Sequence, residues 1–172
     1  MNAGLRHRAW RLGADIDTDQ LAPGRQMKHG LDVIAQHCLE GVRPGFAAGV
    51  RPGDVIVAGP NFGIGSSREQ AASVLVHLGI AAVIAPSYGG LYFRNAFNVG
   101  LLLLTCPQAG DVADGETLAV DARAGRIVRA NGEVLACEPI PGFLLDMVEA
   151  GGLLPQLKAR FARTGARDTE TP

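Results

Sequence analysis

Cysteine is scarce in this sequence. The 172 residues contain Cys38, Cys106 and Cys137, which form no C-x-x-C pair, and four histidines that do not fall at zinc-site spacings. His37 and Cys38 are adjacent, but neighbours on a helix or strand point in different directions. We therefore expect plain thiols, and no metal or cluster held by this chain.

An excess of one charge and long apolar runs are also missing. Its 16 basic and 17 acidic residues are scattered, so there is no basic stripe of the kind that nucleic acid or an anionic membrane requires. No window approaches about eighteen uninterrupted apolar residues. The N-terminal MNAGLRHRAWRL lacks the apolar region and cleavage site of a secretion signal. We expect no nucleic-acid partner, no membrane partner and a cytoplasmic location.

What is present is an alternation of strand and helix patterns. At 47% hydrophobic residues, the chain is long enough for one domain with a real core. Residues 70–78 have apolar positions at helical spacing and Gly79 where a helix should stop. The expected strands cover residues 8–12, 54–59, 80–86 and 101–105, with a second helix before Gly100. This succession predicts an α/β sheet core.

The pattern changes after Pro107. Residues 117–139 alternate apolar and polar positions across turn signals, which predicts antiparallel hairpins forming a second layer. Two short helices should follow, broken at Gly151 and Gly152, and residues 163–172 read as a polar, disordered tail. We expect a single domain over residues 1–162.

The most informative stretch is GPNFGIGSSREQAA, residues 59–72. Ser66 and Glu69 fit a capping box that would start a helix. Alternatively, Gly63 and Gly65 let backbone N–H groups converge near a helix N-terminus, where Arg68 would add a fork suited to a carboxylate or phosphate. The stretch has neither the lysine of a nucleotide P-loop nor the G-x-S-x-G of a hydrolase elbow.

Three aspartates, Asp15, Asp17 and Asp19, recur near the N-terminus. A calcium loop would need glycine and glutamate where Gln20 and Gln26 stand, so we expect these aspartates to turn the chain and bond its backbone instead.

At this point the chain resembles a known family, the small subunits or swivel domains of the aconitase superfamily, specifically those of 3-isopropylmalate dehydratase and homoaconitase. GPNFGIGSSREQA resembles the GxNFGxGSSRExA signature, and DIDTDQLAPGR resembles DxDTDxIxPxR. VIAPSYGGLYFRNAFNVGLLLL and FLLDMVEAGGLLPQLK resemble two further family segments, so the likeness spans residues 9–157. It implies a swivelling β/β/α three-layer domain.

Three positions depart from the family pattern. Ile64 stands where cysteine is usual, Gln70 where histidine is usual, and Tyr88-Gly89-Gly90 replaces Phe-Ala-Arg. The departures suggest a diverged paralogue and leave the exact substrate open.

The resemblance implies a hydro-lyase that isomerises a 2-hydroxy acid by dehydration and rehydration. By the resemblance Ser66 is the base, as an alkoxide stabilised by backbone N–H groups and Arg68, while Ser67 and Arg68 hold a substrate carboxylate. The leaving hydroxyl needs a Lewis acid, which in the family is a [4Fe-4S] cluster on a separate large subunit. The chain should therefore be active only with that partner.

The resemblance also points to a substrate-facing loop at residues 26–29, with Met27, Lys28 and His29 as substrate-binding residues. Family members for isopropylmalate place an apolar group here and those for tricarboxylates a cation. Isopropylmalate, and with it leucine biosynthesis, comes first on family frequency. Homoaconitate, citrate and substituted maleates stay open as alternatives. A non-catalytic anion-binding module remains as an alternative of another class.

Overall fold

The protein forms one mixed sheet of seven strands with helices on one side. The computed structural model describes residues 5–167. The strands run β1 Arg6–Arg11, β2 Val55–Val57, β3 Ala82–Ala85, β4 Leu102–Thr105, β5 Thr117–Asp121, β6 Arg126–Val128 and β7 Val134–Ala136. The order across the sheet is β4-β3-β2-β1-β5-β6-β7.

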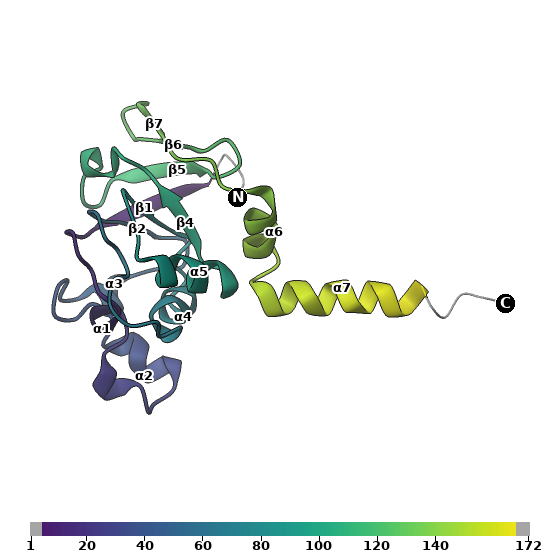
Figure 1. Ribbon diagram of the computed structural model, residues 1–172. Helices are drawn as coiled ribbons and strands as arrows, with labels where there is room; N and C mark the ends of the chain where they lie inside the picture. The colour runs from purple at the N-terminus through teal and green to yellow at the C-terminus, as the bar shows by residue number, and fades with distance from the viewer. Residues whose placement is uncertain (1–4, 168–172) are drawn as a thin grey trace.

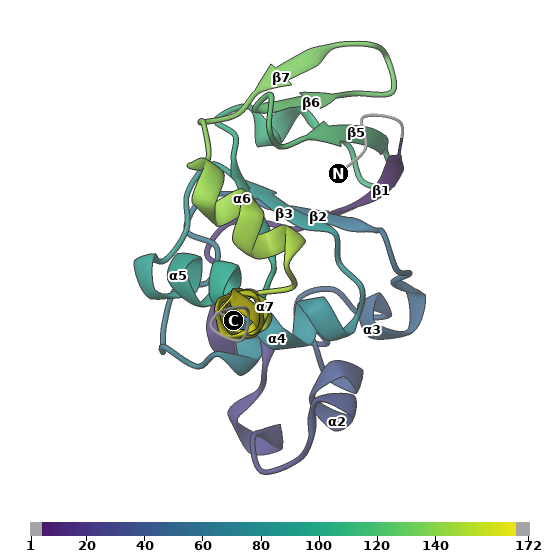
Figure 2. The same cartoon turned by 90° about the vertical axis from the view of Figure 1, so that its right-hand side faces the viewer.

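The first strand joins two differently built halves. Residues 9–11 of β1 pair in parallel with β2, whereas residues 6–8 pair antiparallel with β5. Strands β2, β3 and β4 continue in parallel, and β5, β6 and β7 form antiparallel hairpins. Because β1 changes partners halfway, the antiparallel half folds over the parallel half as a separate layer (Figure 2).

The helices are α1 Thr18–Leu21, α2 Leu31–Gln36, α3 Phe46–Gly49, α4 Gln70–His77, α5 Gly90–Asn98, α6 Gly142–Glu149 and α7 Leu153–Arg167, with short 3₁₀ turns at Gly24–Gln26 and Ala109–Asp111. Helices α4 and α5 lie on the side of the parallel strands away from β5 to β7 (Figures 1 and 2). The predicted β/β/α fold is confirmed, since the layers run antiparallel strands, parallel strands, helices.

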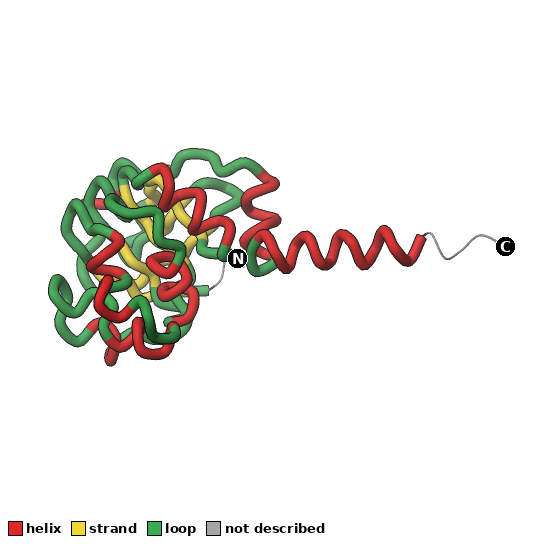
Figure 3. Tube along the Cα trace, turned by 60° about the horizontal axis from the view of Figure 1, so that its bottom comes forward, coloured by secondary structure: helices red, strands yellow, loops and turns green. Residues whose placement is uncertain are grey.

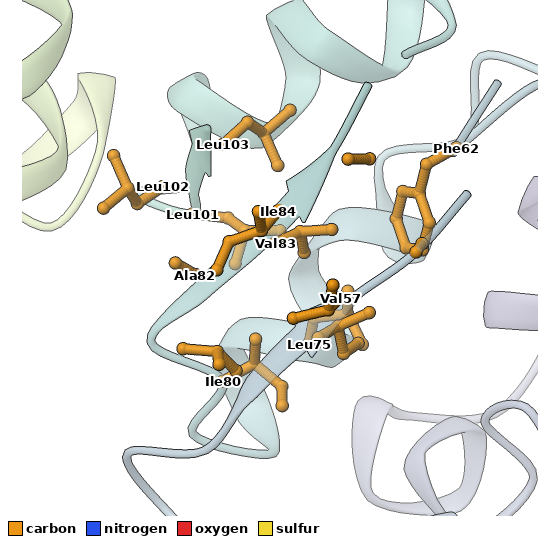
Figure 4. Packing of buried hydrophobic residues seen from close by; sticks show 14 of the residues in the cluster. Val57, Phe62, Leu75, Ile80, Ala82, Val83, Ile84, Leu101, Leu102 and Leu103 are labelled. Carbon is orange, nitrogen blue, oxygen red and sulfur yellow. The ribbon is translucent and has the colours of Figure 1, made fainter. Parts of the chain in front are cut away.

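Burial follows from this layering. All four residues of β3 are buried because the antiparallel layer covers one face and helices cover the other, and Figure 4 shows Val83 and Ile84 among Val57, Leu75 and Leu103. Strand β5 alternates buried and half-buried positions, as a strand with one covered face should. Fully burying each large aliphatic side chain contributes about 1.5 to 3 kcal/mol.

The C-terminal helices differ in part from the prediction. The expected break lies at Gly151 and Gly152, but α7 continues to Arg167 and projects from the body (Figure 3). Residues 163–167, predicted as disordered tail, therefore extend the helix, because residues 156–163 are mostly good helix formers that carry the helix forward. Residues 168–172 lie outside the described part, and the single-domain boundary at 162 stays a prediction. None of the helices described is both long and apolar enough to cross a membrane.

Candidate active site

The glycine-rich segment leaves the carboxyl end of β2, a central parallel strand, where open α/β sheets generally bind ligands. Its path is held by two isolated bridges, Asp17 with Ile64 and Phe62 with Tyr88. Gly63 has a positive φ of 78° and lies against the ring of Tyr92, which leaves no room for a side chain. The segment is therefore anchored to α5 on one side and to the aspartate-rich turn on the other.

Ser66 forms hydrogen-bond contacts with Thr18, which is distant in sequence. The Ser66 N–H donates to Thr18 Oγ1 at 3.0 Å, and the two hydroxyl oxygens are 3.1 Å apart. Thr18 is only 2% exposed, whereas Ser66 is exposed. Because Thr18 Oγ1 already accepts the Ser66 N–H, its own proton is available to a Ser66 oxygen that carries negative charge.

Helix α1 supplies the geometry for Thr18. Asp17 caps this helix by accepting from the Gln20 N–H at 2.8 Å, and the Gln20 side chain accepts from the Asp17 N–H. This reciprocal capping box fixes the turn that presents Thr18. The prediction that the aspartates bond the local backbone is confirmed for Asp17 and for Asp19, which accepts from the Gly24 N–H, whereas the Asp15 side chain accepts from Asn61 Nδ2 instead.

Arg68 is held in place by Asp19. Its Nη1 donates to Asp19 Oδ1 at 2.9 Å and to the Ala22 carbonyl at 2.7 Å. The pKa of Asp19 is lowered by the hydrogen bond from the Gly24 N–H and then by Arg68, so this carboxylate stays charged. Hydrogen bonds within residues 5–167 use only Nη1 of Arg68, which leaves the rest of its fork for a carboxylate.

Two local features predicted for this stretch are not formed. The capping box from Ser66 is wrong, because α4 begins only at Gln70, its N-cap is Glu69, and no side chain caps it. Gly63 does not contribute a free donor to an anion nest, because its N–H donates to the Ile16 carbonyl at 2.6 Å. Gly65 keeps a positive φ of 102° and remains the predicted nest residue.

Sequence reasoning missed the residues that support the predicted ones. Thr18 and Asn95 were not singled out, and Asp19 was expected only to bond the local backbone, although all three stand within DIDTDQLAPGR and YFRNAF. Asn95, on α5, donates its Nδ2 to the Ser67 carbonyl at 2.9 Å and so fixes the backbone beside Ser66. The signal was there in the motifs, but the contacts join positions far apart in sequence.

The predicted substrate-facing loop lies beside this site but does not contact it directly. The Gly24 N–H donates to Asp19 Oδ1 at 2.8 Å, which ties the start of the loop to the partner of Arg68. Met27 packs in part against the core, and Lys28 and His29 are exposed. In the described residues, no hydrogen bond or ion pair joins Lys28 or His29 to Ser66 or Arg68.

The site is an open surface rather than a closed pocket. A cavity of about 290 Å³ borders Asp19 and Gly24 but is lined on its other side by Arg25, His37 and Glu40, away from Ser66. Ser66 and Ser67 are both exposed. In the described residues, no other side chain shields these two hydroxyls from water.

The thiols do not make a cluster site in the described part of the chain. Within residues 5–167, no three His, Cys, Asp or Glu side chains gather as metal ligands. Cys38 is buried, and desolvation raises its pKa. Cys106 and Cys137 approach each other, and the hydrogen bond between their thiols lowers the pKa of Cys106 to about 7. One buried thiol and one pair do not supply the four ligands of an iron–sulfur cluster.

His77 lies on the exposed side of α4. Its Nε2 is 3.0 Å from Asp32 Oδ1.

Known proteins share this architecture. Residues 50–109 match the family model described as the aconitase C-terminal domain. The chain is 45% identical to 3-isopropylmalate dehydratase small subunit 1 of Methanopyrus kandleri over 92% of this chain and 95% of that protein. It is 43% identical to the methanogen homoaconitase small subunit of Methanothermobacter thermautotrophicus, over 90% and 91% of the two chains.

A solved structure agrees. The crystal structure of 3-isopropylmalate dehydratase from Methanocaldococcus jannaschii superposes with a TM-score of 0.88 at 38% identity, covering 94% of this chain and 98% of that chain.

Proposed function

This chain belongs to the family of 3-isopropylmalate dehydratase small subunits, the small subunits of aconitase-type hydro-lyases, and from that premise we propose that it isomerises 2-isopropylmalate to 3-isopropylmalate together with a large subunit. The assignment places it in leucine biosynthesis. We keep its cytoplasmic location as a proposal from the sequence.

The observation that carries the proposal is the contact between Ser66 and Thr18. Dehydration of a 2-hydroxy acid requires removal of a weakly acidic proton beside a carboxylate. A serine oxygen can do this only as an alkoxide, which needs hydrogen-bond donors to stabilise it. Thr18 Oγ1, 3.1 Å from Ser66 Oγ, is positioned to donate to that oxygen. We assign Ser66 as the base and Thr18 as the residue that positions and stabilises it.

Carboxylate recognition falls to Arg68 and Ser67. Asp19 and the Ala22 carbonyl hold Arg68 through Nη1, so the guanidinium is oriented before a ligand arrives. Asn95 holds the Ser67 backbone. Preorganised groups of this kind hold a substrate without reorganising as it reacts.

The Lewis acid for the leaving hydroxyl belongs, in this proposal, to the large subunit as a [4Fe-4S] cluster. The described thiols of this chain do not fit such a cluster, and the open surface at Ser66 supports a partner that covers it. This chain's own part is to remove the proton and to hold the substrate carboxylate.

Homoaconitate is the second candidate substrate. The exposed Lys28, in the loop tied to Asp19, is a cation that could meet an extra carboxylate once a partner closes the site. Met27, half-buried beside it, suits an isopropyl group instead. The relatives include both kinds of enzyme by name.

The test is reconstitution of the chain with the large subunit from the same genome. The chain alone should bind no stoichiometric iron and turn over no isopropylmalate, and the complex should be active. Ser66→Ala should lower kcat by about 100- to 1000-fold, as removal of one key site group does, with substrate binding retained. Ser67→Ala should act mainly on KM.

Two results would contradict the assignment. Stoichiometric iron with a cluster absorption band in this chain alone would show that this chain, and not the large subunit, holds the Lewis acid. Turnover of Ser66→Ala within a few fold of wild type would remove Ser66 from its role as base.

A further inference from the structure

Helix α7 carries an apolar stripe that the described part of the chain leaves largely exposed. Leu154 and Phe161 are 69% and 70% exposed, and Leu157 is half-buried. Their i, i+3 and i+7 spacing puts all three side chains on one side of the helix. The helix projects from the body in Figures 1 and 3. A helix of this length is marginal alone in water, so a surface that packs on the stripe would stabilise it.

The first turn of α7 packs closely against the end of α5, and this packing sets the direction of the helix. Gly152, with φ of 115°, packs so closely on the end of α5 that a β-carbon would lie 2.6 Å from the Asn98 carbonyl oxygen. Gly100 in turn packs against the Gly151 backbone. Helix α7 also contacts α6. The apolar stripe is therefore held at a defined angle away from the core.

A groove connects the base of α7 to the serine segment. This groove, of about 430 Å³, is lined by Glu69, Val99 and Leu154 among others. A second groove, of about 260 Å³, shares Val99 and contains Val76, which is 41% exposed. Glu69 directly follows Arg68, so the grooves begin where the candidate active site ends. We call the surface formed by Val76, Val99, Leu154, Leu157 and Phe161 the α7 face.

Charge argues against a second copy as the occupant. The sequence of α7, LLPQLKARFARTGAR, contains no acidic residue, and Lys158 lies next to the apolar stripe. Two such helices packed on each other would bring like charges together, whereas an acidic rim around an apolar groove would complement them. The occupant should therefore be a different chain.

We propose that the large subunit of the enzyme docks on the α7 face through an apolar groove with an acidic rim. The inference rests on the proposed function, because a partner has to cover Ser66, and the groove that begins at Glu69 reaches Leu154, the first residue of the apolar stripe. Phe161 and Leu154 are the anchors. Large, exposed apolar side chains on a formed helix are typical anchors of a helix-in-groove contact.

The test measures binding separately from turnover. The large subunit from the same genome is titrated with fluorescently labelled small subunit, using wild type and the Leu154→Glu/Phe161→Glu double variant. Loss of two central apolar anchors should raise Kd by at least about 100-fold. The matched control is Val134→Glu, which adds a charge at a 56% exposed apolar position on the edge strand β7, and it should leave Kd within about threefold.

The outcomes separate this inference from the proposed function. Equal Kd for wild type and the double variant overturns the docking surface, even if the complex is active. A free small subunit that sediments as a dimer, and becomes a monomer in the double variant, also overturns it by naming a second copy as the occupant. A complex that forms and depends on Leu154 and Phe161 but has no hydro-lyase activity sustains the docking surface and rejects the function.

Discussion

Two arginine–aspartate pairs flank β2 in opposite settings: Asp54 directly precedes the strand, and Arg68 lies in the segment that follows it. At the amino end, Asp54 is 6% exposed and accepts hydrogen bonds from Arg8 Nη2 at 2.5 Å, Trp10 Nε1 at 2.8 Å and the Arg51 N–H at 2.9 Å. Beyond the carboxyl end, the side chain of Asp19, which belongs to α1, is 68% exposed and holds Arg68.

The difference separates a structural ion pair from a binding one. Asp54 accepts hydrogen bonds from Arg8, Trp10 and the Arg51 N–H, all through Oδ2, so it stabilises the junction of β1 and β2. Asp19 orients Arg68 through one nitrogen, and the remaining donors face an open surface beside Ser66. An arginine and an aspartate therefore acquire their role from burial and from how completely they are bonded.

The largest effect should come from replacing the buried Asp54, and it should be on stability. Asp54→Ala should lower the free energy of unfolding by about 2 to 3 kcal/mol, because it removes the acceptor of the Trp10 N–H and of the Arg8 guanidinium. Arg8 is partly exposed, so water compensates part of its loss. Turnover of the complex should not change. Denaturant unfolding measures the loss. Asp146→Ala, which breaks an exposed pair with Arg123, is the control and should change the free energy of unfolding far less.

Lowering the pH should reduce the difference in stability between the wild type and Asp54→Ala. Burial raises the pKa of Asp54, but the hydrogen bonds from Arg8 and Trp10 outweigh it and leave the pKa below its usual value. Its stabilisation is therefore complete above the unfolded value of about 3.9 and is lost as pH falls through the lower folded value. The stability gap between wild type and Asp54→Ala should narrow below about pH 4. A gap that is constant from pH 7 to pH 3 would show that the charge of Asp54 is not its source.

Thr18→Val, at the candidate active site, should have an intermediate effect, and it should be on turnover. The variant keeps the shape but removes the hydroxyl beside Ser66, and we expect kcat to fall about tenfold, with KM nearly unchanged, as loss of one neutral hydrogen bond predicts. Thr18→Ser keeps the hydroxyl and should recover most of the turnover. If both variants lose turnover equally, packing at Thr18 rather than its hydroxyl is what matters.

The smallest effect concerns substrate choice at Lys28. If this side chain pairs with an extra carboxylate in the complex, Lys28→Ala should raise KM for homoaconitate by up to about tenfold and leave KM for isopropylmalate nearly unchanged. Lys28→Arg, which retains the charge, is the control. The measurement is the steady-state KM of the complex for both substrates. Equal changes in the two KM values would show that Lys28 does not determine substrate specificity.

Much of the fold was predictable because its signals are local. The helical spacing before Gly79, the buried strands of residues 80–86 and 101–105, the hairpins after Pro107 and the break at Gly151 depend on residues close in sequence. Family motifs added the layer order, which no local pattern contains. The serine segment itself was also identified from its composition.

Tertiary structure alone decided how that segment is built. The spacing of Ser66 and Glu69 suits a helix cap, but the Ser66 N–H bonds Thr18 and the Gly63 N–H bonds the Ile16 carbonyl, so the helix starts later. A backbone donor takes whichever acceptor the fold brings within reach, and these acceptors come from a turn more than forty residues earlier in the sequence. For that reason the sequence identified Ser66 as a candidate, whereas only the packing of α1 against the glycine-rich segment revealed its neighbour.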